Sequence, residues 1–84
     1  MDIHEVWTQL IRQLKSYPNV NASQIDAFFS RVQIQAVSSD FIMFTSNNGF
    51  IKEWVEKHYI KDIKQALFDL YGVDYLVQIE IDPT

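Results

Sequence analysis

Few side chains in this sequence have the types and spacing that chemistry requires. His4 lies close to the N-terminus, and His58 has no cysteine, nearby second histidine or carboxylate at a metal-site spacing. Metal sites need several converging ligands, so both histidines are expected to be structural or solvated. Acid pairs such as Glu53 and Glu56 are typical of exposed helix charges. With no phosphate-cradling glycine loop and no local Ser-His-Asp signature, the sequence predicts no catalysis, no metal and no cofactor.

Three lysines form a candidate positive face. Lys57, Lys61 and Lys64 are spaced at i, i+4 and i+7, which places them on one face of a helix. The chain as a whole carries 7 basic and 11 acidic residues, a net charge of −4, whereas duplex-binding domains normally present a basic face. Interleaved acids such as Glu53 and Asp62 favour a solvated face, and a weak single-stranded nucleic-acid face is the alternative.

Two aromatic residues lie at positions typical of an interaction anchor, at the edge of an apolar stripe and in the first turn of a helix. Trp7 lies at the margin of the apolar stripe of the first predicted helix, so it is either a core residue or a contact for another molecule. Phe50 lies in the first turn of a helix, where a side chain has few neighbours. Because Trp54 and Val55 can fill the core one turn later, the sequence predicts that Phe50 is exposed beside a polar helix cap, Asn48.

The elements that position these residues follow from hydrophobic periodicity. Tyr17 precedes a proline and ends the first helix, because the residue before proline avoids the α region. Ser23 and Asp26 resemble a capping box for the second. The predicted elements are a helix over 5–17, a helix from 21 or 23 to 31, a hairpin of strands over 32–37 and 41–45, a helical stretch over 48–71, and a strand over 75–81.

The long helical stretch cannot be one straight rod with a single buried face. Its first half places four apolar residues on one side: Phe50, Ile51, Trp54 and Val55. Its second half places four others, Tyr59, Ile63, Leu67 and Leu70, roughly 150° away at 100° per residue. A break near residues 58–60 would turn both stripes toward one core, and Gly72 can end the stretch in the left-handed conformation. The expected fold is therefore α+β, one domain over 1–84, with a three-stranded sheet and helices on one face.

Two patterns resemble a known family. Residues 48–59 read Asn-x-Phe-x-x-x-Trp-Val-x-x-x-Tyr, and Val6-Trp7 is followed by apolar residues at helical spacing. Both resemble the N-terminal domain of the bacterial replication initiator DnaA, over nearly the whole chain. The resemblance implies a KH-like arrangement. KH domains clamp single strands with a Gly-x-x-Gly loop between two helices. The connection over 17–23 has no glycine, which favours binding of proteins over binding of bases.

The resemblance also implies roles for particular residues. It assigns weak self-association to Trp7, and contacts with the replicative helicase and initiation regulators to Asn48 and Phe50. Gln24 stands where some family members have an acidic partner-binding residue, and Phe28 stands where a tryptophan is common. These two departures imply a divergent member with weakened or altered contacts at the second helix.

The function expected from sequence is thus a protein-interaction module rather than an enzyme. It would associate weakly with itself and recruit the helicase or regulators, while other domains of a longer initiator would bind ATP and origin DNA. The N-terminus lacks the basic and apolar regions of a signal peptide, and no apolar run is long enough to span a bilayer. A cytoplasmic protein is expected. The alternatives are a weak single-stranded nucleic-acid binder and a purely structural domain.

Overall fold

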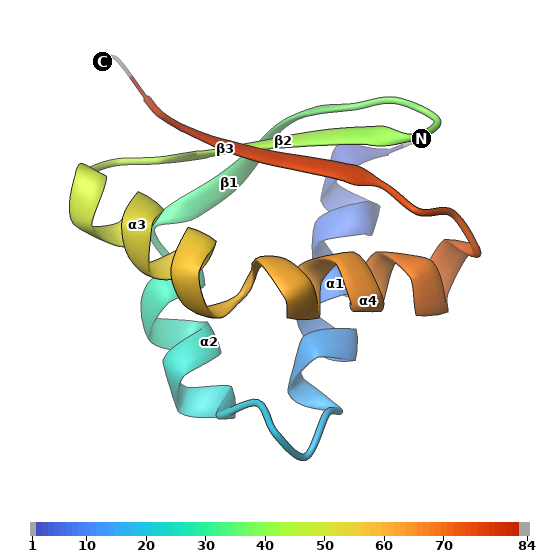
Figure 1. The fold of residues 1–84 in the computed structure, drawn as a ribbon, viewed down its shortest axis with the longest axis horizontal. Coiled ribbons are helices and arrows are strands. Elements are labelled where there is room, and N and C mark those ends of the chain that lie inside the picture. Colours follow the sequence, from blue (N-terminus) through green and yellow to red (C-terminus); the bar gives the residue numbers. More distant parts are fainter. Residues whose placement is uncertain (1, 83–84) are drawn as a thin grey trace.

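The structure, a computed structural model, describes residues 2–82. Four helices and three strands follow one another in the order helix, helix, strand, strand, helix, helix, strand, as expected for the predicted α+β class (Figure 1). The elements are α1 (Ile3–Lys15), α2 (Ala22–Phe29), β1 (Val32–Val37), β2 (Phe41–Ser46), α3 (Gly49–His58), α4 (Ile60–Tyr71) and β3 (Leu76–Ile81). Within residues 2–82, none of these helices has the length and apolar character that crossing a membrane requires.

The three strands form one mixed sheet with β2 in the centre. β1 and β2 pair antiparallel, which confirms the predicted hairpin, and a bulge interrupts their register between Ile34 and Ala36. β3 pairs with β2 in parallel, from Phe41 opposite Leu76 to Ser46 opposite Ile81. Parallel neighbours need a long crossover connection, and α3 and α4 provide it. All four helices lie on one side of the sheet (Figure 1).

Side-chain caps fix where the first two helices begin. The Asp2 side chain accepts a hydrogen bond from the backbone N–H of His4 at 3.0 Å, so α1 begins at Ile3, two residues earlier than predicted. Asn21 caps α2 by accepting from the N–H of Gln24 at 3.1 Å. The predicted capping box is therefore wrong: Ser23 lies inside the helix, two residues after the cap.

The predicted break in the long helical stretch is confirmed at Tyr59. This residue has φ −125° and ψ −7°, outside the helical region, and separates α3 from α4. The change of direction turns both apolar stripes inward, so that Ile51, Val55 and Ile63 are all buried in one core. Gly72 ends α4 with φ 70°, the left-handed conformation that glycine adopts without strain.

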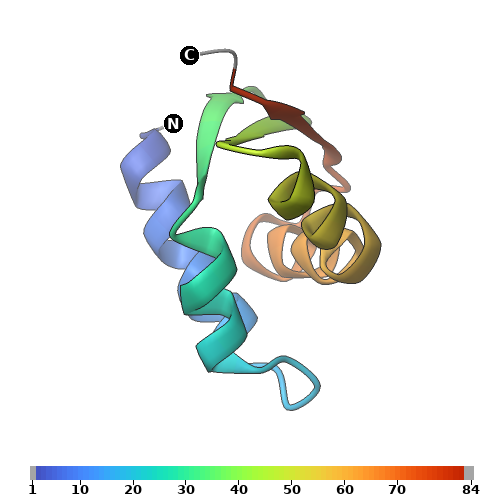
Figure 2. The ribbon, with the colours of Figure 1, turned by 90° about the vertical axis from the view of Figure 1, so that its left-hand side faces the viewer.

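The core lies between the sheet and the helices. Figure 2 shows α1 and α2 on one side of the molecule and α3 and α4 on the other, with the sheet across them. Three tyrosine hydroxyls at the edges of this core join the two helix pairs: Tyr71 donates to Gln9 and Tyr59 to Gln24, each at 2.7 Å, and Tyr17 donates to Asp69. The most deeply buried apolar side chains are Val6, Leu10, Leu14, Ile25, Ile42, Phe44, Val55, Ile63, Ala66 and Leu67.

Candidate functional site

A continuous row of aromatic rings lies where α2 meets α3. Phe28 of α2 stacks on Trp54 of α3 with ring centroids 4.9 Å apart and planes 9° apart. Phe50 lies one turn before Trp54 at 6.2 Å, and His58 lies one turn after it at 4.2 Å. Residues four apart share one helix face, which is why the three α3 rings line up. We call these four residues the aromatic seam.

Phe50 is the exposed end of the aromatic seam. Its side chain is 66% exposed, whereas Ile51 is 5% and Val55 is 1% exposed. The structure thus places Phe50 at the surface, as the sequence predicts. Trp54 differs from its expected core position: it is half-buried, and Ile51 and Val55 supply the buried face of α3. A hollow of about 160 Å³ opens beside these rings and is lined by Phe50, Glu53, Trp54, Lys57 and His58.

Asn48 caps the N-terminus of the helix that carries Phe50. Its side-chain oxygen accepts a hydrogen bond from the N–H of Ile51 at 2.8 Å, which satisfies a backbone donor of the first turn. Its amide nitrogen donates to the side-chain oxygen of Asn47 at 3.1 Å. Asn48 therefore acts first as a cap, and any partner contact that it makes must be compatible with that bond.

Gln24 lies on the same side of the molecule as the aromatic seam. It is one turn before Phe28 on α2, and its side-chain oxygen accepts the hydrogen bond of the Tyr59 hydroxyl. Burial, reinforced by the charge of Asp62, raises the pKa of Tyr59, so this hydroxyl remains a donor at neutral pH. The bond uses the amide oxygen of Gln24. The amide nitrogen is thus the group that the exposed Gln24 can offer to a partner.

The three lysines do not form the single stripe expected from their spacing. The break at Tyr59 changes the direction of the chain between Lys57 and Lys61. Lys57 lines the hollow at the aromatic seam, whereas Lys61 and Lys64 line a different hollow along α4. A spacing of i, i+4 and i+7 describes one face only within an unbroken helix, which is the physical reason for the error.

Trp7 lies apart from the aromatic seam, over the other side of α2. It is half-buried, with its ring 6.1 Å from that of Phe29 and 6.3 Å from that of Phe44. It therefore contributes to the core and also reaches the surface. It borders a hollow of about 200 Å³ that is lined by Trp7, Ile11, Ile25, Asp26, Phe29 and Ser30.

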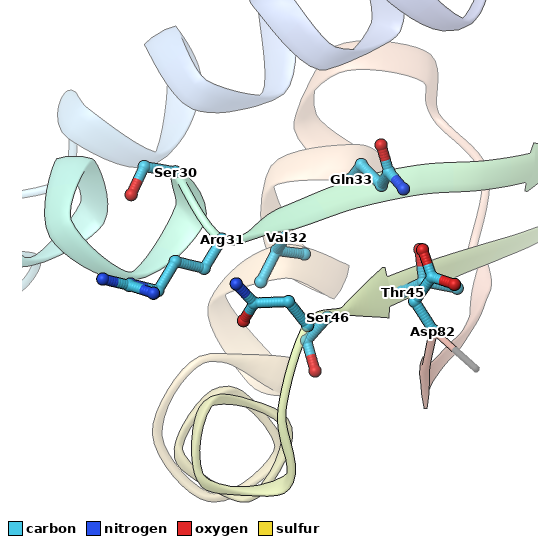
Figure 3. A pocket seen from close by; sticks show the side chains of 8 residues that line it. Ser30, Arg31, Val32, Gln33, Thr45, Ser46 and Asp82 are labelled. Carbon is cyan, nitrogen blue, oxygen red and sulfur yellow. The ribbon is translucent and has the colours of Figure 1, made fainter. Parts of the chain in front are cut away.

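A polar hollow of about 220 Å³ lies where β1 begins and β2 and β3 end (Figure 3). Its two serines are engaged with the main chain: Ser30 donates to the carbonyl of Ala27, and Ser46 to that of Asn48. Figure 3 shows Arg31 directed away from Thr45 and Asp82, so its charged groups do not converge. Nothing in this arrangement activates a nucleophile. Within residues 2–82, no group of three or more acidic or histidine side chains could hold a metal.

The aromatic seam was only partly visible from the sequence. In the sequence, Phe28 stands out only as a departure from the family that the chain resembles, and no pattern pairs it with Trp54 or gives His58 a contact. The i, i+4, i+8 spacing of Phe50, Trp54 and His58 was the available signal. The stack across α2 and α3 depends on how two helices approach each other, which periodicity does not specify.

Comparisons with known proteins agree with this arrangement. The family model of the DnaA N-terminal domain matches residues 4–69. The chromosomal replication initiator protein DnaA of Pseudothermotoga lettingae is 30% identical over 73 residues, which cover 87% of this chain and 16% of that protein. The chain thus spans about a sixth of the length of this relative. A chain in the crystal structure of a HobA–DnaA (domain I–II) complex from Helicobacter pylori shares the fold, with a TM-score of 0.77, 19% identity, and coverage of 93% of this chain and 99% of that chain.

Proposed function

Since the chain belongs to the DnaA N-terminal domain family, we propose that it is a protein-interaction module of replication initiation, and that the aromatic seam is its partner-binding surface. The observation that carries this proposal is the exposure of Phe50, at 66%, beside the half-buried Trp54. Binding energy in protein interfaces concentrates in a few aromatic anchors surrounded by polar groups. Asn48, Lys57 and Gln24 supply such polar groups around the rings.

A second feature of Trp54 supports an interface here. Its indole N–H is buried and has no hydrogen-bond partner in the part of the chain that the structure describes. A buried donor without a partner costs free energy, and small movements at a surface seam can bring it to a partner acceptor. A protein that docks over Phe50 and supplies a carbonyl or carboxylate near the indole would recover that energy.

The replicative helicase and initiation regulators are the partners that the family implies. The crystal structure of the HobA–DnaA complex supports a protein partner, because that assembly contains a chain of the same fold. Binding of ATP and origin DNA belongs, in this proposal, to other domains of a longer protein. The module would also associate weakly with a second copy through Trp7, whose ring reaches the surface beside a hollow.

The alternative function, a weak nucleic-acid face formed by Lys57, Lys61 and Lys64, gains no support from the geometry. Lys57 lines one hollow, and Lys61 and Lys64 line another. The net charge of −4 also repels a polyanion. A protein partner remains the better conclusion.

The test compares two exposed apolar side chains. Phe50→Ala removes the anchor of the aromatic seam, and Leu76→Ala is the matched control, because Leu76 is also exposed (62%) but lies on β3. Affinity for the purified replicative helicase of the source organism is measured by biolayer interferometry, and circular dichroism checks folding. Phe50→Ala is expected to weaken binding about tenfold or more, equivalent to about 1.4 kcal/mol, and Leu76→Ala less than about twofold. Equal affinities for wild type and Phe50→Ala would contradict the assignment of the seam.

A further inference from the structure

A second hollow lies along α4, separated from the aromatic seam by the break at Tyr59. It has a volume of about 420 Å³, larger than the hollow beside Phe50, and it opens between the exposed face of α4 and the loop that leads to β3. We call it the α4 groove. Its lining residues are Lys61, Lys64, Gln65, Phe68 and Asp74.

The apolar part of the α4 groove is Phe68. The opposite face of α4 is fully buried through Ile63, Ala66 and Leu67, so the helix already has its core contacts without Phe68. Phe68 is 52% exposed, and within the groove it lies beside the two lysines. A single exposed apolar side chain is ordinary on a protein surface. An aromatic side chain in a concavity with cations around it is a more specific arrangement.

The charged part of the α4 groove is incompletely neutralised. Lys64 approaches Asp74 at 3.8 Å, and the two side chains are 42% and 84% exposed. An exposed pair at this distance contributes little stability. Lys61 takes no part in the ion pairs formed between described side chains. Asp74 therefore shows that a carboxylate fits beside Lys64, in a position from which an incoming carboxylate could displace it at low cost.

We propose that the α4 groove binds a segment of a partner protein in which an aliphatic or aromatic side chain is flanked by carboxylates. The apolar side chain packs on Phe68, and the carboxylates pair with Lys61 and Lys64. This surface is distinct from the aromatic seam, so a partner there is additional to the one in the proposed function. A domain with two such surfaces can hold two proteins at once.

Charge and symmetry disfavour the other occupants. A single-stranded nucleic acid would meet only two lysines and one ring here, on a chain with a net charge of −4. A second copy paired in parallel along α4 would bring Lys61 and Lys64 against the same lysines of the other copy, and raising the protein concentration in the test below detects an antiparallel pairing about Phe68. A short segment with an apolar side chain between carboxylates has neither disadvantage, because its charges are opposite to those of the lysines.

The test uses a short fluorescent peptide with a central leucine–phenylalanine pair and two glutamates on each side. Two control peptides replace the glutamates by lysines or the central pair by serines, and a short oligothymidylate represents single-stranded DNA. Binding to the 84-residue chain is followed by fluorescence anisotropy and by amide chemical shifts in ¹⁵N spectra. The shifts identify the surface, which separates this proposal from the one at Phe50.

Shift changes at Lys61, Phe68 and Asp74 with the acidic peptide alone would support the proposal. Lys61→Glu should then weaken binding about fivefold or more, whereas Arg12→Glu, which makes the same change of charge on α1, should weaken it less than about twofold. Asp74→Asn should tighten binding, since it removes the competing carboxylate.

Other outcomes overturn it. Absence of shift changes along α4, equal binding of the lysine peptide, or equal effects of Lys61→Glu and Arg12→Glu would each exclude the proposed occupant. Shift changes at Phe68 caused by oligothymidylate, or by raising the concentration of the protein alone, with none caused by the acidic peptide, would assign the groove to nucleic acid or to a second copy instead.

Discussion

Truncation of Phe50 is the most direct test of its role as an interaction anchor, because it should weaken partner binding strongly and lower the free energy of unfolding only slightly. Truncating a buried phenylalanine typically costs about 3–5 kcal/mol. Phe50 is 66% exposed, so about one third of a burial free energy of about 1.5–3 kcal/mol, or about 0.5–1 kcal/mol, is at stake. The ring contact with Trp54 at 6.2 Å adds about 0.5–1 kcal/mol, and the better helix propensity of alanine returns about 0.5 kcal/mol. We therefore expect Phe50→Ala to lower the free energy of unfolding by about 1 kcal/mol.

The matched control is Ile51→Ala, one residue further along α3. Ile51 is 5% exposed, and truncating a buried isoleucine costs about 2–5 kcal/mol. Urea titrations followed by far-ultraviolet circular dichroism give the free energy of unfolding from the midpoint and the slope m. Ile51→Ala should shift the midpoint to lower urea at least twice as far as Phe50→Ala does, with unchanged m in both.

The stability of Phe50→Ala decides between the two roles of this side chain. A loss of 3 kcal/mol or more, or a loss equal to that of Ile51→Ala, would show that Phe50 supports the core in solution, and would remove it as an interaction anchor. A small loss combined with unchanged affinity for the helicase would refute the binding role alone. Only a small loss with a large fall in affinity agrees with the exposed geometry.

Three further predictions concern other parts of the fold. Trp7→Ala should weaken self-association in sedimentation experiments while the domain stays folded. Some loss of thermal stability is expected, because the ring packs on the core. Equal sedimentation of wild type and Trp7→Ala at high concentration would contradict the role of Trp7 in self-association. Asn48→Ala should lower the free energy of unfolding by about 1 kcal/mol through loss of the α3 cap, whereas an unchanged urea midpoint would argue against that cap. Burial raises the pKa values of three tyrosines, Tyr17, Tyr59 and Tyr71, above 10.0, so the unfolded chain loses these protons first as pH rises. The free energy of unfolding should therefore be at its full value below about pH 10 and fall above it, less steeply in Tyr59→Phe. A urea midpoint that does not fall above about pH 10 would contradict the burial of these hydroxyls.

The sequence specified local structure well. The cap at Asn48, the turn before Pro18, the alternation of β1 and the left-handed Gly72 all follow from interactions between residues close in the chain. Even the break at Tyr59 was predictable, because two apolar stripes roughly 150° apart cannot face one core along a straight helix. The incorrect prediction of Ser23 as a helix cap also concerned local structure, since Asn21 offered an equally suitable cap two residues earlier.

Parts of the candidate site were also available from the sequence. The first-turn position of Phe50 predicted its exposure, and the neighbouring Ile51 and Val55 had the spacing of a buried face. The binding roles of Asn48, Phe50 and Gln24 rest on the family and remain predictions. The sequence thus identified which side chains are able to anchor a partner, but not which of them meet.

Only the tertiary structure determined which of these side chains contact one another. Phe28 stacks on Trp54, and the Tyr59 hydroxyl reaches Gln24, across a sequence separation that no local pattern encodes. The same holds for the parallel pairing of β3 with β2 and for the division of the lysines between two hollows. The physical reason is that periodicity fixes which face of each element is apolar, whereas the angle at which two faces pack depends on the shapes of all the side chains between them.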